Sequence, residues 1–350
     1  MRFIQAGLGD FGREWAEYLN KTDDYELAGV ADPSPAGRDW AARTLGLPPE
    51  KIFATIEEAL RGAEADAVLV VTPPATHLAV ATAALNAGKH VLSEKPMVPT
   101  LAEAREAIAV ANRTGKIYMV SQNYRYRAHA RLVRKLVAEG AIGPLISVSI
   151  DSQRDMRHDY EATNFRYLMR HPYVIDMSIH HADLIRALTG QNVATVSARS
   201  WRVPDSPYQH DPALAALITL DNGATLLYEG SGATYRPWTS WNGDWELVGE
   251  RGRIVWDGGV DDPDLGRVTL QLWGEEPREI APSEGELYGW PAVLAAFRHA
   301  TETGERPETS VHDNIHSLAI VAALAESIDR AAPVKVADLL VADEGRGAGS

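Results

Sequence analysis

The architecture follows from one stretch near the start of the chain, Arg2-Phe3-Ile4-Gln5-Ala6-Gly7-Leu8-Gly9-Asp10-Phe11-Gly12. A short apolar run leads into three glycines spaced G-x-G-x-x-G, and a helix is predicted from about residue 11 to 19. After a strand, this spacing gives a tight turn, close approach of a pyrophosphate, and close helix–strand packing. The helix N-terminus adds unpaired N–H groups and the positive end of its dipole. The stretch predicts a dinucleotide-binding turn; a turn that only packs a helix on a strand is the alternative.

A carboxylate supports the dinucleotide reading. Asp32 ends the second predicted strand, 20 residues after Gly12, where it can accept hydrogen bonds from the adenosine ribose hydroxyls. It would also repel a 2′-phosphate, so NAD is expected rather than NADP. Arg38 lies close enough in the sequence to weaken that preference.

The order of strand-like and helix-like runs along the chain predicts two domains. Strand-like and helix-like runs alternate up to about residue 122, which is typical of a doubly wound parallel sheet with helices on both faces. Beyond it, apolar alternations separated by turns such as Asp221-Asn222-Gly223 indicate antiparallel hairpins. We expect a Rossmann domain over 1–122, a substrate-binding and oligomerisation α/β domain over 123–340, and a flexible tail over 341–350.

Composition narrows the function. Among 350 residues, Lys and Arg total 34 against 48 Asp and Glu, a formal net charge of −14, which disfavours nucleic-acid and anionic-membrane partners. The absence of cysteine excludes disulfides, thiolate metal sites and cysteine nucleophiles. Gln5 and Asp10 interrupt the opening apolar run, and no run reaches the roughly 18 apolar residues of a membrane helix. A cytoplasmic location is expected.

Further motifs follow in a fixed order: Thr72-Pro73-x-x-x-His77, Glu94-Lys95-Pro96, Asn123-Tyr124-Arg125 and Asp176-x-x-x-His180. With the glycine turn and Asp32, they make the chain closely resemble the glucose–fructose oxidoreductase / inositol dehydrogenase (Gfo/Idh/MocA) family over about its whole length. The resemblance implies a Rossmann domain followed by an α/β domain with a large, open, mostly antiparallel sheet. It also implies an NAD(P)-dependent enzyme acting on a secondary alcohol of a sugar or cyclitol, often as a homodimer or homotetramer.

The resemblance implies a role for each matched residue of the first domain. The cofactor-binding set is Gly7, Gly9, Phe11, Gly12, Asp32, Thr72, Pro73, His77, Glu94 and Lys95. Phe11 and Gly12 would face the pyrophosphate, and Thr72, Pro73 and His77 the nicotinamide side. Glu94 and Lys95 would lie at the nicotinamide ribose and reacting carbon, with Lys95–Pro96 often cis. Two departures are Pro74, where many relatives carry Asn, and Met169-Arg170-His171-Pro172-Tyr173, where they usually carry a glycine-rich turn.

The chemistry needs a group that takes the hydroxyl proton. Asp176 and His180 are four residues apart on a helix predicted from about residue 174 to 188, so they share a face. The carboxylate can fix the imidazole tautomer and support its positive charge, while Lys95 would stabilise a developing alkoxide. Whether Lys95 or His180 carries the proton is open, and a plain helix ion pair is the structural alternative. A metal site is disfavoured because too few ligands converge.

Substrate contacts are expected from Lys95, Asn123, Arg125, Arg154, Asp176 and His180. Arg154 begins a charged segment that would either reach substrate hydroxyls or form a surface loop. Tyr235, Trp238, Trp241 and Trp245 would stack on a sugar or serve as packing residues. The leading function is an NAD(H)-dependent oxidoreductase of a sugar, glycoside or cyclitol. The alternatives are an NAD-recycling glycoside hydrolase or epimerase, and a non-catalytic cofactor-binding protein.

Overall fold

The computed structural model describes residues 1–161, 163–259, 266–283 and 285–341. Their contacts divide the chain into two units, one of residues 1–122 and 293–315, the other of residues 123–292 and those from 316 on. The predicted tail, apart from Val341, lies outside the described residues. No helix in the described ranges is long and apolar enough to span a membrane.

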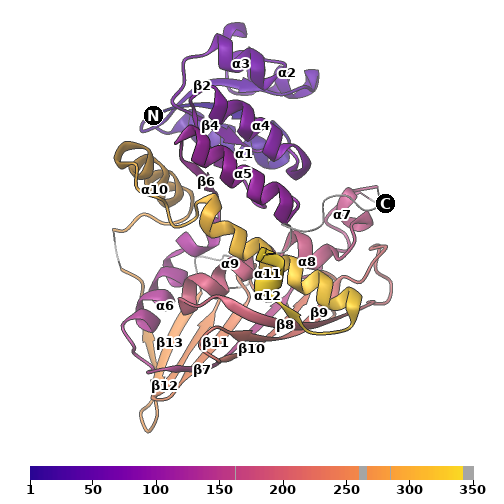
Figure 1. Cartoon of the computed structure of the whole chain (residues 1–350), viewed down its shortest axis with the longest axis vertical. Helices are drawn as coiled ribbons and strands as arrows, with labels where there is room; N and C mark the ends of the chain where they lie inside the picture. The colour runs from indigo at the N-terminus through magenta and orange to yellow at the C-terminus, as the bar shows by residue number, and fades with distance from the viewer. Residues whose placement is uncertain (162, 260–265, 284, 342–350) are drawn as a thin grey trace. The chain divides into compact units, whose positions relative to one another are not determined.

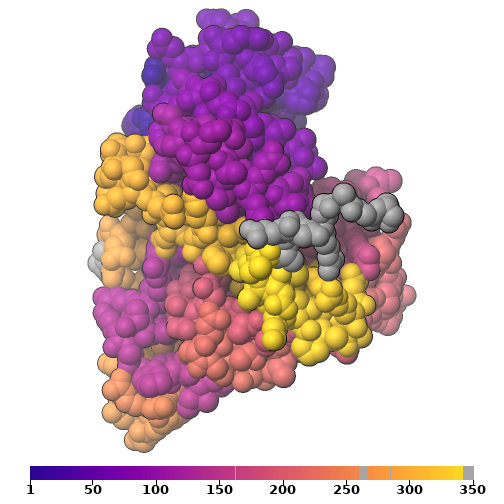
Figure 2. Space-filling model, in the orientation of Figure 1, coloured from indigo at the N-terminus to yellow at the C-terminus, as the bar shows by residue number. Residues whose placement is uncertain are grey.

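The first unit is a parallel sheet of six strands in the order β3-β2-β1-β4-β5-β6. The strands are β1 (Arg2–Ala6), β2 (Glu26–Ala31), β3 (Ile52–Phe53), β4 (Ala67–Val70), β5 (His90–Ser93) and β6 (Tyr118–Val120); the helices between them are α1 (Asp10–Lys21), α2 (Pro35–Thr44), α3 (Ile56–Gly62), α4 (Pro74–Asn86) and α5 (Leu101–Thr114), with the 3-10 helix η1 (Pro49–Lys51) before β3. Helices α4 and α5 cover the parallel strands (Figure 1), and their side chains hide the sheet in the space-filling view (Figure 2). The predicted doubly wound fold is confirmed.

Local sequence explains why these elements begin and end where they do. All four residues of β4 are fully buried, as a strand covered on both faces requires. Thr100 and Glu103 form a reciprocal capping box at the start of α5. Gly115 ends that helix at φ 64°, in the left-handed region that favours glycine.

One boundary differs from the prediction. Residues 293–315, expected in the second domain, group with the first unit. The reason is the apolar face of α10 (Gly289–Thr303), where Val293, Leu294 and Phe297 are fully buried. The Phe297 ring lies 5.9 Å from the ring of Phe3 in β1, so α10 completes the core of the parallel sheet.

The second unit is built on a sheet of nine strands in the order β14-β13-β12-β11-β7-β10-β9-β8-β15. These are β7 (Leu145–Gln153), β8 (Val193–Trp201), β9 (Ala213–Leu220), β10 (Thr225–Ser231), β11 (Asp244–Gly249), β12 (Gly252–Asp257), β13 (Arg267–Leu272), β14 (Arg278–Ile280) and β15 (Val334–Lys335). Only β7 and β10 pair in parallel, so the predicted mostly antiparallel sheet is confirmed.

Helices lie over one face of this sheet, as Figure 1 shows for α6 and α9. The helical elements outside the parallel-sheet unit are η2 (Asn123–Tyr126), α6 (Ala128–Ala138), α7 (Phe165–Leu168), α8 (Pro172–Asp176), α9 (Ser178–Thr189) and α12 (Val336–Val341), and α11 (Val311–Arg330) crosses the division between the units. Along β10 the burial alternates: Leu226 and Tyr228 are buried, whereas Leu227 is 58% exposed. One face of the sheet therefore packs under helices and the other carries exposed side chains.

Candidate active site

At two of the three glycines in the turn between β1 and α1, backbone atoms leave no room for a side chain. Gly7 has φ 100°, and a Cβ there would lie 2.5 Å from the carbonyl oxygen of Val71. A Cβ on Gly12 would lie 2.5 Å from the carbonyl oxygen of Gly7. Buried Gln5 fixes this turn, since its Nε2 donates to the carbonyls of Gly7 at 2.9 Å and Gly12 at 2.5 Å.

The third glycine is different. Apart from Gly9 and its two chain neighbours, no atom of the described residues lies within 4 Å of the position that a Cβ on Gly9 would occupy. Gly9 is the N-cap of α1 and makes no side-chain cap hydrogen bond, and Phe11 beside it is 41% exposed. The space left by Gly9 therefore opens outward at the positive end of a helix, which suits a dinucleotide phosphate.

Asp32 lies beside this turn, in the loop after β2. Its Oδ2 accepts from the backbone N–H of Leu8 at 2.6 Å, and its Oδ1 from that of Ser34 at 2.8 Å. Arg38 points its Nη1 at the carbonyls of Asp32 at 2.7 Å and Pro33 at 2.9 Å. The structure thus brings Asp32 to the glycine turn and engages Arg38 with backbone oxygens.

His77 ties together the segments that follow β4 and β5. It is 1% exposed, and its Nε2 lies 2.7 Å from the carbonyl of Thr72 while its Nδ1 lies 2.9 Å from that of Pro96. Burial lowers the pKa of His77, and the two carbonyls partly oppose that shift. Thr72 is half-buried and Pro73 exposed at the start of α4. His77 therefore links Thr72 to the segment that carries Lys95.

Lys95 is half-buried after β5, and its peptide bond to Pro96 is cis, as the resemblance implied. Glu94 is 6% exposed; its Oε1 accepts from Trp15 Nε1 at 2.9 Å and its Oε2 from the Lys95 N–H at 3.1 Å. Burial raises the pKa of Glu94, and these hydrogen bonds offset part of the rise. Glu94 thus joins α1 to the Lys95 main chain, a connection through Trp15 that the sequence did not predict.

Asp176 and His180, in the second unit, lie on either side of a helix break. The predicted continuous helix is divided at Met177 into α8 and α9, and the His180 N–H donates to the Met177 carbonyl at 3.0 Å. This i to i−3 bond tightens the start of α9. Asp176 accepts from Arg166 Nε at 3.0 Å, a cation that sequence reasoning missed.

The segment before α8 shows how the chain replaces a glycine-rich turn. His171 has φ 51°, in the left-handed region, where a residue with a Cβ is strained. Its Nε2 lies 3.0 Å from Oδ1 of Asp329, which also accepts from Arg170 Nη2 at 2.6 Å. These contacts hold a non-glycine residue in the unusual conformation.

Tyr124 stacks on the His180 ring. The ring centroids lie 3.9 Å apart with the planes inclined by 13°. The guanidinium carbon of Arg127 lies 4.0 Å from the centroid of the same tyrosine ring. Burial raises the pKa of Tyr124, Arg127 opposes the rise, and Asp176 adds to it. Asp176 is therefore within electrostatic range of the ring that stacks on His180.

The other ionisable groups of α9 have structural partners. Buried His181 lies 2.8 Å from the Tyr228 hydroxyl and 3.2 Å from the Trp241 carbonyl, and burial lowers its pKa to about 4. Asp183 pairs with Arg125 through contacts of 2.7 and 2.5 Å and accepts from Ser317 Oγ at 3.1 Å. No group of three His, Asp or Glu in the described parts of the chain is arranged to hold a metal ion.

Arg125, one of the expected substrate contacts, is engaged within the protein. It is 6% exposed and forms a bidentate pair with Asp183, which is fully buried. Removing one charge of such a buried pair strongly destabilises a protein. Through this pair Arg125 connects η2 to α9. Asn123, at the start of η2, is half-buried.

Arg154 lies between two of the predicted aromatic residues. Its guanidinium carbon is 4.7 Å from the ring centroid of Trp238 and 4.3 Å from that of Trp241. Tyr235 instead lies under Arg157, at 4.3 Å. Trp245 is 1% exposed and stacks on Trp256 at 6.2 Å, so of the two alternatives given for it, packing fits: Trp245 is a core residue.

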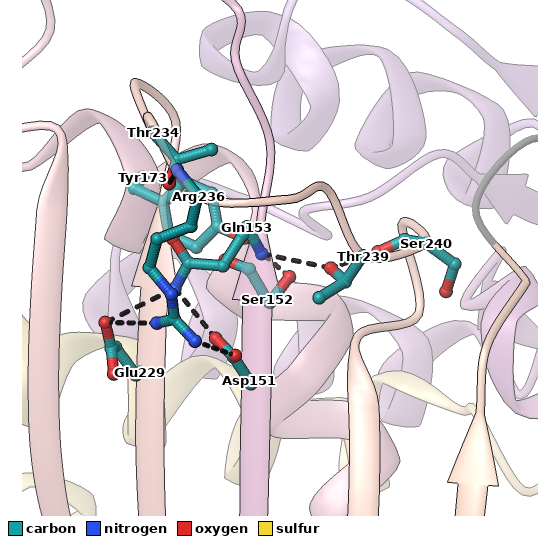
Figure 3. Close-up of polar contacts among 9 residues, drawn as sticks. All are labelled: Asp151, Ser152, Gln153, Tyr173, Glu229, Thr234, Arg236, Thr239 and Ser240. Atoms are coloured by element: carbon teal, nitrogen blue, oxygen red, sulfur yellow. Dashed lines mark hydrogen bonds and ion pairs between the residues drawn. The ribbon is translucent and has the colours of Figure 1, made fainter.

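The loop that carries Trp238 and Trp241, residues 232–243, is fastened to the sheet (Figure 3). Arg236 donates to Asp151 at 2.5 Å and to Glu229 at 2.7 Å. Thr239 accepts from the Gln153 N–H and donates its own N–H to the Gln153 carbonyl, both at 3.0 Å. These bonds hold the aromatic loop against the ends of β7 and β10.

Comparison with known proteins agrees with the fold of both units. The model of an oxidoreductase family with an NAD-binding Rossmann fold matches residues 1–122, and that of the GFO/IDH/MocA C-terminal domain matches residues 130–255. An uncharacterized protein of Sinorhizobium fredii, y4oX, is 29% identical, covering 97% of this chain and 96% of its own. The inositol 2-dehydrogenase of Rhizobium meliloti is 26% identical over 96% of this chain and 99% of its own. An Agrobacterium radiobacter oxidoreductase, solved with NAD+, L-tartaric acid and magnesium, has a TM-score of 0.85 at 20% identity, covering 97% of this chain and 99% of its own.

Proposed function

Because the chain belongs to the Gfo/Idh/MocA oxidoreductase family, with its NAD-binding Rossmann fold, we propose that it is an NAD(H)-dependent dehydrogenase. It transfers hydride between the nicotinamide and a secondary alcohol of a sugar, glycoside or cyclitol. The observation that carries this proposal is the open space at Gly9. At Gly7 and Gly12, the other two glycines of the turn, backbone atoms already occupy the space that a Cβ would need. The inositol 2-dehydrogenase relative supports the cyclitol class.

The preference for NAD over NADP rests on charge. Asp32 places a carboxylate beside the glycine turn, where it accepts the ribose hydroxyls and repels a 2′-phosphate. Arg38 is directed to the carbonyls of Asp32 and Pro33, which supports the same preference.

In the first unit, Lys95 donates a hydrogen bond to the reacting oxygen and stabilises its developing charge. Glu94 and His77 fix the main chain around Lys95. Thr72 and Pro73 line the nicotinamide side, and the nicotinamide, when bound, supplies the hydride acceptor.

In the second unit, His180 is the proposed proton acceptor. Asp176, four residues earlier, supplies the negative charge that supports a protonated imidazole. Asn123 and Arg154 are the proposed contacts to the substrate hydroxyls. Arg125 is left out because Asp183 occupies its guanidinium.

The test is absorbance at the NADH band, with purified protein, NAD or NADP, and a panel of sugars, glycosides and inositols. A steady rise with NAD and one substrate group is expected. Product found by chromatography without any rise would instead indicate the NAD-recycling hydrolase or epimerase. Absence of product from the whole panel would contradict both enzymatic functions.

Substitutions test the roles proposed for Lys95 and His180. Lys95→Ala and His180→Ala should each lower turnover about 100-fold or more, while NAD binding measured by calorimetry persists. Lys89→Ala, at a half-buried position, and His299→Ala, at an exposed one, are the controls and should retain full turnover. Turnover near the normal rate in either site variant would overturn its assignment.

A further inference from the structure

Three side chains of the second unit form one continuous stack: the guanidinium of Arg127, the phenol ring of Tyr124 and the imidazole of His180. Arg127 and His180 lie at 4.0 and 3.9 Å from the centroid of the same tyrosine ring. Two groups at that height above the same face would overlap, so they occupy opposite faces. Tyr124 is therefore held from both sides, and it is 9% exposed.

We infer that Tyr124 and Arg127 are positioning residues that fix the imidazole plane of His180 for proton transfer. The inference rests on the role proposed for His180. The lone pair by which an imidazole accepts a proton lies in the ring plane. A ring stacked at 13° to a buried tyrosine cannot rotate about its outer side-chain bond without losing the contact. The stack thus determines the plane in which His180 can receive a proton.

The outer end of the stack is also fixed. Arg127 Nη1 donates to Asn242 Oδ1 at 2.6 Å, and Asn242 is fully buried. The Asn242 N–H in turn donates to Ser240 Oγ at 3.0 Å. Ser240 and Thr239 belong to the loop that is fastened to the sheet (Figure 3). The cation that backs Tyr124 is therefore anchored to the same framework as the aromatic loop.

The same 3-10 helix offers a matched control. Tyr126, two residues after Tyr124, is 1% exposed and has the guanidinium carbon of Arg131 4.5 Å from its ring centroid. It is a buried tyrosine with an arginine over its ring, but it is not the one that stacks on His180. Replacing Tyr126 reports the cost of losing a buried tyrosine from η2, whereas replacing Tyr124 also removes the platform.

The first measurement needs no substrate. In a histidine-selective NMR spectrum, the signals assigned to His180 by their loss in His180→Gln should be shifted upfield by the tyrosine ring. Tyr124→Phe should keep that shift, Tyr124→Leu should abolish it, and Tyr126→Leu should leave it in place. Persistence of the shift in a folded Tyr124→Leu protein would overturn the stack itself.

The second measurement is steady-state turnover with the substrate identified by the panel. Tyr124→Leu should lower kcat roughly 10- to 100-fold with little change in the KM for NAD, because a misplaced base weakens the chemical step. Tyr124→Phe should stay within about three-fold of the parent, and Arg127→Met should lower kcat more than Arg131→Met. If a leucine variant does not fold, the comparison of Arg127→Met with Arg131→Met still decides the test. Equal losses of kcat in Tyr124→Leu and Tyr126→Leu, and in Arg127→Met and Arg131→Met, would leave only a packing role for Tyr124 and Arg127. An inactive parent protein with the NMR shift intact would instead count against the proposed function alone.

Discussion

At the scale of single residues, burial decides what His181 can do. It follows the proposed proton acceptor in the sequence, yet it contacts Tyr228 and the Trp241 carbonyl in the interior. Burial lowers its pKa to about 4, whereas an unfolded histidine titrates near 6.5. His181 is therefore a neutral structural residue at neutral pH.

This difference predicts a pH dependence of stability. Between about pH 6.5 and 4 the unfolded chain binds a proton at His181 that the folded chain does not, so stability is lost as the pH falls. The contribution is about 3 kcal/mol across that window. Urea unfolding of the parent and of His181→Gln at several pH values measures it. The stability difference between the two should shrink as the pH falls from 7 to 4, and a constant difference would contradict the assignment.

Residues whose roles are local could be predicted, and those with distant partners could not. Gly7 and Gly12 follow from a motif whose geometry is set within a few residues, and the structure shows why each lacks a side chain. Tyr124 and His180 are separated by more than fifty positions, and nothing in either neighbourhood indicates that the two rings meet. The ion pair of Arg125 with Asp183 was missed for the same reason.

At the scale of elements, the long periodic segments were predicted and the short irregular ones were not. The bounds of α5 follow from the sequence because a threonine cap, an apolar stripe and a terminal glycine all agree. Helix α3 has only seven residues, so its apolar pattern is too short to predict a helix. No sequence pattern marks the break at Met177, and the start of α8 lies at His171, whose partner Asp329 is distant in the sequence.

The loop of residues 232–243 allows an element-scale test. Arg236→Met removes both ion pairs to Asp151 and Glu229, whose side chains are 35% and 44% exposed. Partly exposed pairs contribute at most about 1 kcal/mol, so amide hydrogen exchange in the loop should rise roughly five-fold. Arg267→Met, which removes a comparably exposed pair with Asp257, should leave the loop unchanged. Unaltered exchange in Arg236→Met would show that the other contacts of the loop hold it without these ion pairs.

At the scale of the whole molecule, the sheet of the second unit presents an apolar face to its surroundings. Leu217 and Leu227 are directly paired across β9 and β10 and are 52% and 58% exposed. Large apolar side chains exposed next to each other on a sheet favour association, which supports the expected homodimer or homotetramer.

We predict that this face joins copies of the chain. In light scattering coupled to size exclusion, the parent should have two or four times the 38.2 kDa chain mass. The double variant Leu217→Lys with Leu227→Lys should approach the single-chain mass, because charges facing each other across a closed interface are costly to bury. Leu287→Lys, at a 61% exposed leucine outside the sheet, is the control and should keep the parent mass. A monomeric parent, or a double variant that stays assembled while folded, would exclude this face as the interface.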